Sequence, residues 1–231
     1  MVTSNSAVAT CGAYNAVESP WVQRLCPVPK RFLQELIQRE NLKTGLDIGC
    51  GVVSPFTALR KFGFTSFGAD ISAEEITRSQ AANAHDHYVQ CNFLEHDFGR
   101  QFDVVVLSHV IEHFDRDTGW QVIRKLEEIA SRVVYIETPH GFIEQTAFDG
   151  NPYQRHQSGW FPADFEARGY TVLGNGLRWG AASGSKPGRG PAGLRRLISR
   201  GISWYLFRRP QSASTIAAVR HVDASGNLRE V

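Results

Sequence analysis

The sequence of 231 residues has no apolar run as long as the roughly 18–20 residues that a membrane-spanning helix needs. It also has no basic segment followed by a hydrophobic core near its first residue, so we do not expect secretion. Its four cysteines show neither metal-ligand spacing nor a disulfide pattern. Together these features predict a cytoplasmic protein with reduced thiols.

Acidic residues are missing from a long C-terminal stretch. Residues 167–222 contain ten Lys and Arg and no Asp or Glu, whereas residues 1–166 contain 14 basic and 21 acidic residues. This separation of charge predicts an anionic partner for the C-terminal stretch. Nucleic acid is disfavoured as that partner, because no recognition motif accompanies the charge.

Apolar segments that alternate in period indicate an α/β fold. Apolar spacing over 29–38 predicts a helix, which we expect at the sheet edge. Candidate strands and helices then alternate, which predicts a doubly wound, mostly parallel sheet with helices on both faces. The expected strands are 44–48, 65–69, 87–91, 102–107 and 132–137, and the expected helices are 55–62, 73–83 and 117–130.

The C-terminal part predicts a short helix at 164–167 and two more strands at 170–173 and 215–222. Residues 194–207 have the spacing of an amphipathic helix, whose apolar face would hold Leu194, Leu197, Ile198, Ile202 and Tyr205. Its basic face fits a helix packed on the core, or one that meets an anionic membrane or a lipid-linked substrate. We expect one domain over 1–231, with a mobile segment at 1–28 and a basic insertion at 180–210.

The most informative motif lies where the first expected strand ends. Asp47 is followed by Gly49-Cys50-Gly51. A carboxylate at the mouth of a parallel strand, beside glycines that let a ligand approach the backbone, predicts a nucleotide-type pocket. The segment resembles the first motif of the class I S-adenosylmethionine-dependent methyltransferases, although Val53 stands where that family often has glycine.

Three further segments follow at the spacing of that family. Asp70 ends the second strand, where a carboxylate can accept hydrogen bonds from ribose hydroxyls. Asn92 ends the third, where the family usually has Asp, and His109 to Phe114, expected to open a helix, follows the fourth. The resemblance implies a seven-stranded sheet with an antiparallel last strand. It also implies S-adenosylmethionine binding by Asp47, Gly49, Cys50, Gly51, Asp70, Ile71, Asn92, Phe93, Ser108 and His109.

Histidines are the candidate catalytic residues. Methyl transfer to a hydroxyl needs a base, for which we consider His113, His140 and His156, and also Glu137. Of these, His140 and His156 are favoured. The segment 151–160 resembles the substrate-facing loop of bacterial methyltransferases from cell-surface polysaccharide and glycolipid pathways. This resemblance implies an oxygen of a small molecule, sugar or lipid-linked glycan as the acceptor. His85, His87 and His96 are expected on peripheral segments.

A rival chemistry uses some of the same residues. His109, Glu112 and His113 have the form of an inverted zinc-protease motif, with two histidines four residues apart. Zinc hydrolysis would need a third ligand and a metal-bound water. Because the histidines lie within a consistent nucleotide-binding pattern, we expect no metal.

Two more functions stay open on the sequence alone. A nicotinamide-dependent oxidoreductase would also place Asp70 near a ribose, but its third glycine is replaced by Ser54. A non-catalytic scaffold or cofactor sensor is open because Val53 and Asn92 depart from the family pattern. The sequence predicts no oligomeric state.

Overall fold

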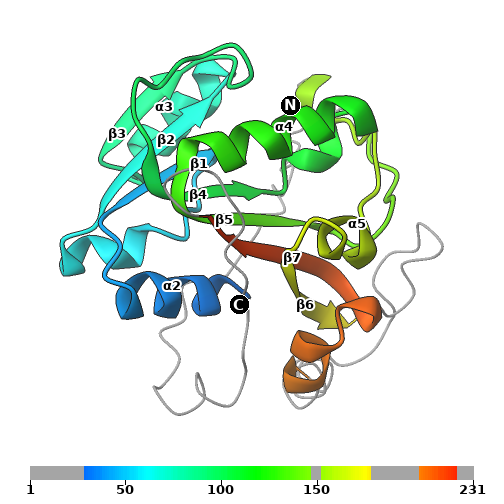
Figure 1. Cartoon of the computed structure of the whole chain (residues 1–231). Coiled ribbons are helices and arrows are strands. Elements are labelled where there is room, and N and C mark those ends of the chain that lie inside the picture. Colours follow the sequence, from blue (N-terminus) through cyan, green and yellow to red (C-terminus); the bar gives the residue numbers. More distant parts are fainter. Residues whose placement is uncertain (1–28, 147–151, 178–202, 223–231) are drawn as a thin grey trace, which may run out of the picture.

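The computed structural model describes residues 29–146, 152–177 and 203–222, and within them seven strands form a single sheet (Figure 1). These strands are β1 (Thr44–Ile48), β2 (Thr65–Asp70), β3 (His87–Gln90), β4 (Phe102–Ser108), β5 (Ala130–Pro139), β6 (Thr171–Leu177) and β7 (Ala213–His221). Their order is β3-β2-β1-β4-β5-β7-β6. Neighbours among β1 to β5 are parallel, and β7 is antiparallel to both β5 and β6. The predicted sheet is confirmed.

The helices agree with the expected ones except in their ends. The α-helices are α2 (Pro29–Arg39), α3 (Ala73–Ala81), α4 (Arg116–Ile129) and α5 (Pro162–Glu166). Short 3-10 helices are η1 (Thr57–Phe62), η2 (Ile111–His113), η3 (Pro152–Gln154) and η4 (Pro210–Ser212). The expected segment 1–28 and most of the insertion 180–210 lie outside the described residues.

Three expected helix boundaries were wrong, each for a local reason. The expected helix at 55–62 is the shorter 3-10 helix η1. α3 ends before the expected residue 83, because Asn83 has a left-handed backbone with φ 50°. Residues 109–114 do not open α4, because 111–113 form the separate 3-10 turn η2. α4 begins after Asp115, whose side chain accepts a hydrogen bond from the Thr118 amide at 2.9 Å.

Helices cover both faces of the sheet, with α4 and α2 on opposite sides in Figure 1. On one face, α4 and α5 pack on the apolar side chains of the central strands. On the other, Leu33, Leu36 and Ile37 of α2 share a buried cluster with Val104 of β4 and Tyr135 of β5. α2 also contacts the edge strand β6, whose Leu173 belongs to the same cluster, so it covers this edge as expected and extends over the central strands.

Part of the basic C-terminal charge is neutralised inside the fold. Glu127 of α4 accepts hydrogen bonds from Arg168 at 2.8 Å, from Arg220 at 2.6 Å and from the hydroxyl of Tyr170 at 2.9 Å. Both arginines therefore contact an acidic side chain of the fold, whose single negative charge offsets one of their two positive charges. Among the described helices, none has the length and apolar content that a membrane span requires.

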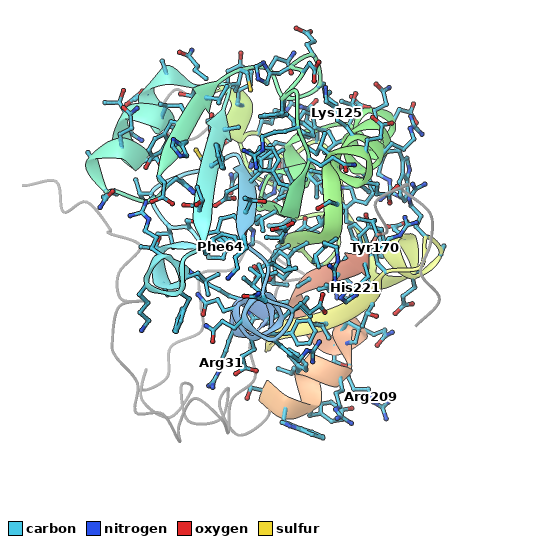
Figure 2. All side chains as sticks on the ribbon, turned by 60° about the vertical axis from the view of Figure 1, so that its left-hand side comes forward. Arg31, Phe64, Lys125, Tyr170, Arg209 and His221 are labelled. Carbon is cyan, nitrogen blue, oxygen red and sulfur yellow. The ribbon has the colours of Figure 1, made fainter. Side chains whose placement is uncertain are left out.

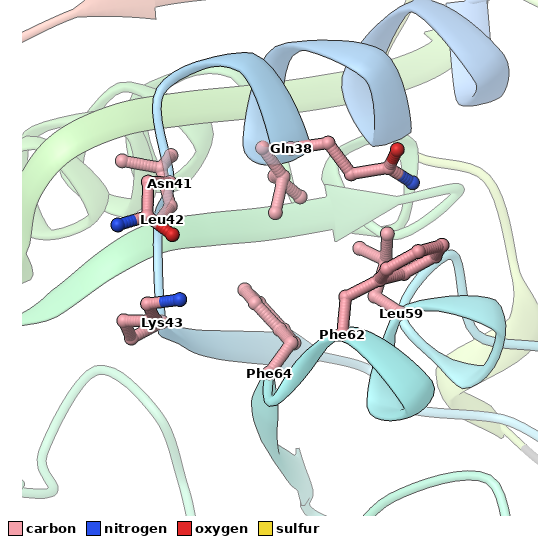
Figure 3. A pocket seen from close by; sticks show the side chains of 8 residues that line it. Gln38, Asn41, Leu42, Lys43, Leu59, Phe62 and Phe64 are labelled. Atoms are coloured by element: carbon pink, nitrogen blue, oxygen red, sulfur yellow. The ribbon is translucent and has the colours of Figure 1, made fainter.

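A pocket of about 250 Å³ lies at the edge of the sheet where β1 and β2 begin (Figure 3). Its walls come from the end of α2, from η1 and from the residues just before the two strands. They are Ile37, Gln38, Asn41, Leu42, Lys43, Leu59, Phe62 and Phe64. Because the acidic residues of the predicted nucleotide pocket lie at the opposite, carboxyl ends of these strands, this pocket is a separate feature.

Candidate active site

The turn after β1 is closed at one glycine and open at the other. The amide of Gly49 donates to the carbonyl of Ala69 in β2 at 2.8 Å, and its φ is 71°. A Cβ added at Gly49 would overlap a methyl group of Val110, whereas a Cβ at Gly51 would have no atom within 4 Å. The backbone of Gly51 thus borders open space, as a ligand that approaches the main chain requires.

Asp47 is buried on the face of the sheet that α2 covers. Burial raises its pKa to about 7, although a hydrogen bond with Ser54 and the charge of Lys30 act in the opposite direction. His85 Nε2 lies 3.5 Å from Asp47 Oδ2. Burial and the charge of Arg60 lower the pKa of His85 to about 4, so His85 is neutral at pH 7 and this contact is not an ion pair.

The position of His85 corrects an expectation. We expected it on a peripheral segment, but it is buried between the turn after β1 and the side chains of Phe56 and Tyr88. Cys50 of that turn and His85 both lie against Gly68 of β2. Sequence periodicity missed this because the segment 82–86 is an irregular connection.

Lys30 is a charged residue of the site that sequence analysis did not single out. It lies on the first turn of α2 and is partly buried. Burial lowers its pKa, while the carboxylates of Asp47 and Glu137 act to raise it. The ammonium group is therefore within electrostatic reach of two strand ends, a proximity that only the packing of α2 creates.

The predicted ribose and adenine residues follow β2 and β3. Asp70 Oδ1 accepts a hydrogen bond from the amide of Ser72 at 2.8 Å, and burial raises the pKa of Asp70. Ile71 is exposed beside it. Asn92 is exposed, and its Oδ1 accepts from the amide of Leu94 at 3.2 Å. These side chains keep accessible oxygen atoms at the carboxyl edge.

Two predicted cofactor residues have buried side chains. Phe93 packs into the core formed with α4, and Cys50 is buried against β2. Burial, with the nearby charges of Asp47 and Asp70, raises the pKa of the Cys50 thiol to about 12. Cys50 and Phe93 therefore have only backbone groups to offer a ligand.

The end of β4 joins the cofactor side to the acceptor side. Ser108 ends β4, and His109 follows with φ 56°, a conformation that costs a non-glycine residue about 1–2 kcal/mol. The His109 amide donates to the carbonyl of Glu137 at 2.7 Å, and its Nδ1 lies 3.4 Å from Glu112 Oε1. Burial opposes the charge of His109, but Glu112 and Glu137 outweigh it and raise the pKa.

The structure brings together two of the three histidines predicted as bases, His113 and His156. One possible ligand atom from each of Glu112, His113 and His156 lies within 4.8 Å of the others, and the two rings are 5.0 Å apart. His140 has a different setting, since its Nδ1 donates to the carbonyl of Ala213 in β7 at 2.9 Å. The zinc-protease motif is not reproduced as a helical pair, because η2 is a single 3-10 turn.

The segment that contains His156 is folded back onto η2. The amides of Gln157 and Ser158 donate to the Glu112 carbonyl at 2.8 Å and 3.2 Å, and the amide of His156 donates to Gln145 at 3.1 Å. Trp160 Nε1 in turn donates to Ser158 Oγ at 2.9 Å. Backbone pairing across some 45 residues of sequence therefore fixes His156 beside Glu112.

Comparison with known proteins bears on the core of this site. Residues 46–147 match the model of a methyltransferase domain family. The matched segment holds all the predicted cofactor residues and the acceptor-side residues as far as His140. No curated protein sequence matches the chain.

The fold is similar to that of several solved methyltransferases. A magnesium protoporphyrin IX methyltransferase from Synechocystis PCC 6803, with bound S-adenosylmethionine, is 16% identical, with 87% of this chain and 79% of that chain covered and a TM-score of 0.50. A S-adenosylmethionine-dependent methyltransferase from Clostridium acetobutylicum ATCC 824 is 12% identical, with 82% and 89% covered and a TM-score of 0.51. The methyltransferase domain of bacterial CtHen1-C is 16% identical, with 86% and 96% covered and a TM-score of 0.52.

At these identities the solved structures establish the fold, and the domain match supplies the chemistry. Together they support a methyltransferase with S-adenosylmethionine as its cofactor. They favour this interpretation over a nicotinamide-dependent oxidoreductase. The cofactor and catalytic residues named from the sequence stay predictions.

Proposed function

We propose that the protein transfers the methyl group of S-adenosylmethionine to an oxygen atom of a small molecule, sugar or lipid-linked glycan. The observation that carries this proposal is the contact between the two sides of the site. A Cβ on Gly49 would overlap Val110, which lies two residues before Glu112, so the glycine turn adjoins the cluster of Glu112, His113 and His156. A bound donor and a polar acceptor group would therefore be neighbours.

The reaction would be an in-line displacement. The acceptor oxygen forms a bond to the methyl carbon, the carbon–sulfur bond breaks, and its electron pair stays on sulfur to give S-adenosylhomocysteine. The donor is already reactive, so alignment of the two partners supplies several kcal/mol of the rate enhancement. The hydroxyl must also lose its proton, and the cluster of Glu112, His113 and His156 is the group we assign to that task.

The roles of the cofactor residues follow from the resemblance and from their exposure. Gly51 would meet the methionine part through its backbone, near the buried carboxyl of Asp47. Asp70 would accept hydrogen bonds from the ribose, and Asn92, with the Phe93 amide, would meet the adenine. Ser108 and His109 would line the methionine end.

Calorimetric titration of the full chain tests the cofactor. We expect S-adenosylmethionine and S-adenosylhomocysteine to bind and NAD not to bind. Asp70→Ala should weaken S-adenosylmethionine binding at least tenfold, because hydrogen bonds to a charged group contribute about 1.5–3 kcal/mol. Asp117→Ala, an exposed carboxylate on α4, serves as the matched control. Tight binding of NAD without S-adenosylmethionine would contradict the proposal.

Labelled-methyl transfer to fractionated cell extracts tests the acceptor. We expect label in the small-molecule fraction or in the lipid and polysaccharide fraction. Label in protein or RNA would contradict the proposed acceptor class. Cofactor binding without transfer to any fraction would favour the scaffold or sensor alternative.

A second proposal concerns the basic C-terminal stretch 167–222, in which residues 203–208 form a helix. Trp204 and Tyr205 are 54% and 57% exposed, with the guanidinium of Arg208 over the first ring and that of Arg209 over the second. Figure 2 shows Arg209 beside this helical segment, at the outside of the molecule. Leu206 is the residue of this helix that is buried, and the rest of the expected apolar face, from Leu194 to Ile202, lies outside the described residues. Exposed aromatic rings beside arginines favour contact with an anionic membrane surface.

Sedimentation with vesicles of phosphatidylserine and phosphatidylcholine tests this contact. We expect the unaltered protein to sediment with the vesicles. The double variant Trp204→Ala, Arg208→Ser should bind them more weakly, because each basic residue near an anionic surface contributes about 1 kcal/mol of binding free energy. Arg124→Ser, at an exposed position of α4, is the control. Equal sedimentation of all three proteins, or none with any of them, would remove the proposal.

A further inference from the structure

We propose that Glu112, His113 and His156 form a binding site for a divalent transition-metal ion, for which Zn²⁺ fits the donor set best. One ligand atom from each residue lies within 4.8 Å of the other two. Two ligands that each lie about 2.1 Å from a tetrahedral zinc ion are about 3.4 Å apart. Side-chain rotations that move each atom by about 1 Å would therefore close the site around an ion.

The two histidines are oriented as metal ligands are. His113 Nδ1 lies 3.2 Å from the carbonyl oxygen of Arg155, and His156 Nδ1 lies 2.7 Å from that of Ile143. Because a carbonyl oxygen only accepts, each Nδ1 must carry the proton, which leaves the lone pair of the neutral ring on Nε2. Histidines that bind metal through one nitrogen donate from the other to a carbonyl or carboxylate in the same way.

Glu112 supplies the anionic ligand. Its side chain is almost fully buried, and Oε2 accepts a hydrogen bond from Thr138 Oγ1 at 3.0 Å. A buried carboxylate is costly unless it is paired with positive charge. The Nδ1 atom of His109 lies 3.4 Å from Oε1, and the side chain of His109 is half exposed. A divalent cation bound between Glu112 and the rings of His113 and His156 would supply positive charge next to the buried carboxylate.

The surrounding backbone holds the three residues in place. The carbonyl of Glu112 accepts hydrogen bonds from the amides of Gln157 and Ser158, so η2 and the segment with His156 are joined next to the proposed ion. His156 is only 9% exposed, which restricts its rotation. A site preorganised in this way needs little rearrangement when it binds a metal.

The metal would act on the acceptor, a role that rests on the proposed function. Three protein ligands leave at least one coordination position open, as in catalytic zinc sites. An acceptor hydroxyl bound there would have a lowered pKa and would release its proton to solvent before it takes the methyl group. His113 and His156 would then be ligands and not bases.

Metal binding by the full chain tests the proposal without any acceptor. After treatment with EDTA and desalting, the protein is titrated with Co²⁺, followed by visible absorption, and with Zn²⁺, followed by calorimetry. We expect one ion per chain and the absorption typical of a four- or five-coordinate cobalt ion. His113→Gln and His156→Gln should each weaken binding by more than about 100-fold. His87→Gln, at an exposed histidine outside the cluster, should bind as the unaltered protein does.

Two results would overturn the site: no binding of either ion, or binding that neither cluster variant weakens. Retained S-adenosylhomocysteine binding and an unchanged melting temperature show that the variants are folded, and Glu112→Gln, which keeps the hydrogen bond from Thr138, provides a third test. The outcome is separate from the proposed function. Metal binding without S-adenosylmethionine binding would reject the proposed methyltransferase and keep the metal site. S-adenosylmethionine binding without metal binding would reject the metal site and keep the proposed methyltransferase.

Discussion

The cofactor side and the acceptor side of the site are built on different length scales. On the cofactor side, Asp47 to Gly51 form one continuous segment that is anchored to the neighbouring strand through Ala69. On the acceptor side, Glu112 meets His156 only because backbone amides more than 40 residues away fold onto η2. The first is a property of a strand and its turn, and the second is a property of the tertiary fold.

This difference predicts where substitutions act. A change in the cofactor turn alters the local backbone and the space for the ligand. A change that loosens the acceptor side acts through elements remote in sequence, because that side rests on loops carried by α4 and α5. Variants on the two sides can therefore be compared by whether they alter stability, cofactor binding or only the geometry of the cluster.

The largest effect is expected at Gly49. In Gly49→Ala the new methyl group would overlap Val110 in a backbone with φ 71°, and we expect a loss of about 2–5 kcal/mol in unfolding free energy. Gly51→Ala has open space and should change stability by less than about 0.5 kcal/mol, while it obstructs the ligand. Urea unfolding and calorimetry with S-adenosylhomocysteine measure the two effects.

The pair of glycine variants also tests the position of the ligand. If Gly51→Ala binds S-adenosylhomocysteine as tightly as the unaltered protein, the ligand does not approach this backbone. If Gly49→Ala is as stable as Gly51→Ala, the overlap with Val110 is relieved by a shift of η2, and the two sides of the site are less rigidly joined than the structure indicates.

The next effect is a pH dependence at Asp47. Its pKa in the fold is about 7, above the ordinary value of 3.8, so the folded state holds the proton more tightly and loses stability as pH rises from about 4 to 7. At 1.36 kcal/mol per pKa unit the loss is on the order of 4 kcal/mol. Asp47→Asn stays neutral, so it should be more stable than the unaltered protein at pH 8 and equal to it near pH 4.

Urea unfolding of the apoprotein at pH 4, 6 and 8 measures this dependence, with Asp117→Asn as an exposed control. The variant should also bind S-adenosylmethionine more weakly, which would show that the buried carboxyl is kept for the ligand at the expense of stability. A variant less stable than the unaltered protein at pH 8 would show that Lys30 and Ser54 outweigh burial.

The same contrast explains what the sequence could predict. Strand alternation and the motif from Asp47 to Gly51 were sufficient for the sheet, because parallel strands and their turns are determined by local patterns. The positions of His85 and α2 could not be predicted in this way. His85 lies in a connection without periodicity, and the apolar stripe of α2 gives its face but not the strands it covers.

The acceptor side shows the limit more sharply. The sequence offered three histidines as bases and favoured His140 and His156, since residue type alone does not tell which rings will meet. The structure separates His140, which binds the backbone of β7, from His113 and His156, whose rings lie together. The deciding contacts are backbone hydrogen bonds to Glu112, for which amino-acid type carries little signal.

The third effect, smaller than those at Gly49 and Asp47 and the most selective one, is expected at Arg116. Its guanidinium binds both carboxylate oxygens of Asp164 at 2.7 Å and 3.0 Å, donates to the Gly159 carbonyl and lies over the ring of Trp160. Because the group is partly exposed, Arg116→Gln should cost only about 1–2 kcal/mol. Arg124→Gln, exposed on the same helix, should cost less than about 0.5 kcal/mol.

The Arg116→Gln variant should affect the two ligands differently. We expect its S-adenosylhomocysteine binding to stay unchanged, while its Zn²⁺ binding weakens because the segment with His156 loosens. Equal loss of both ligands would show that the two sides are one cooperative unit.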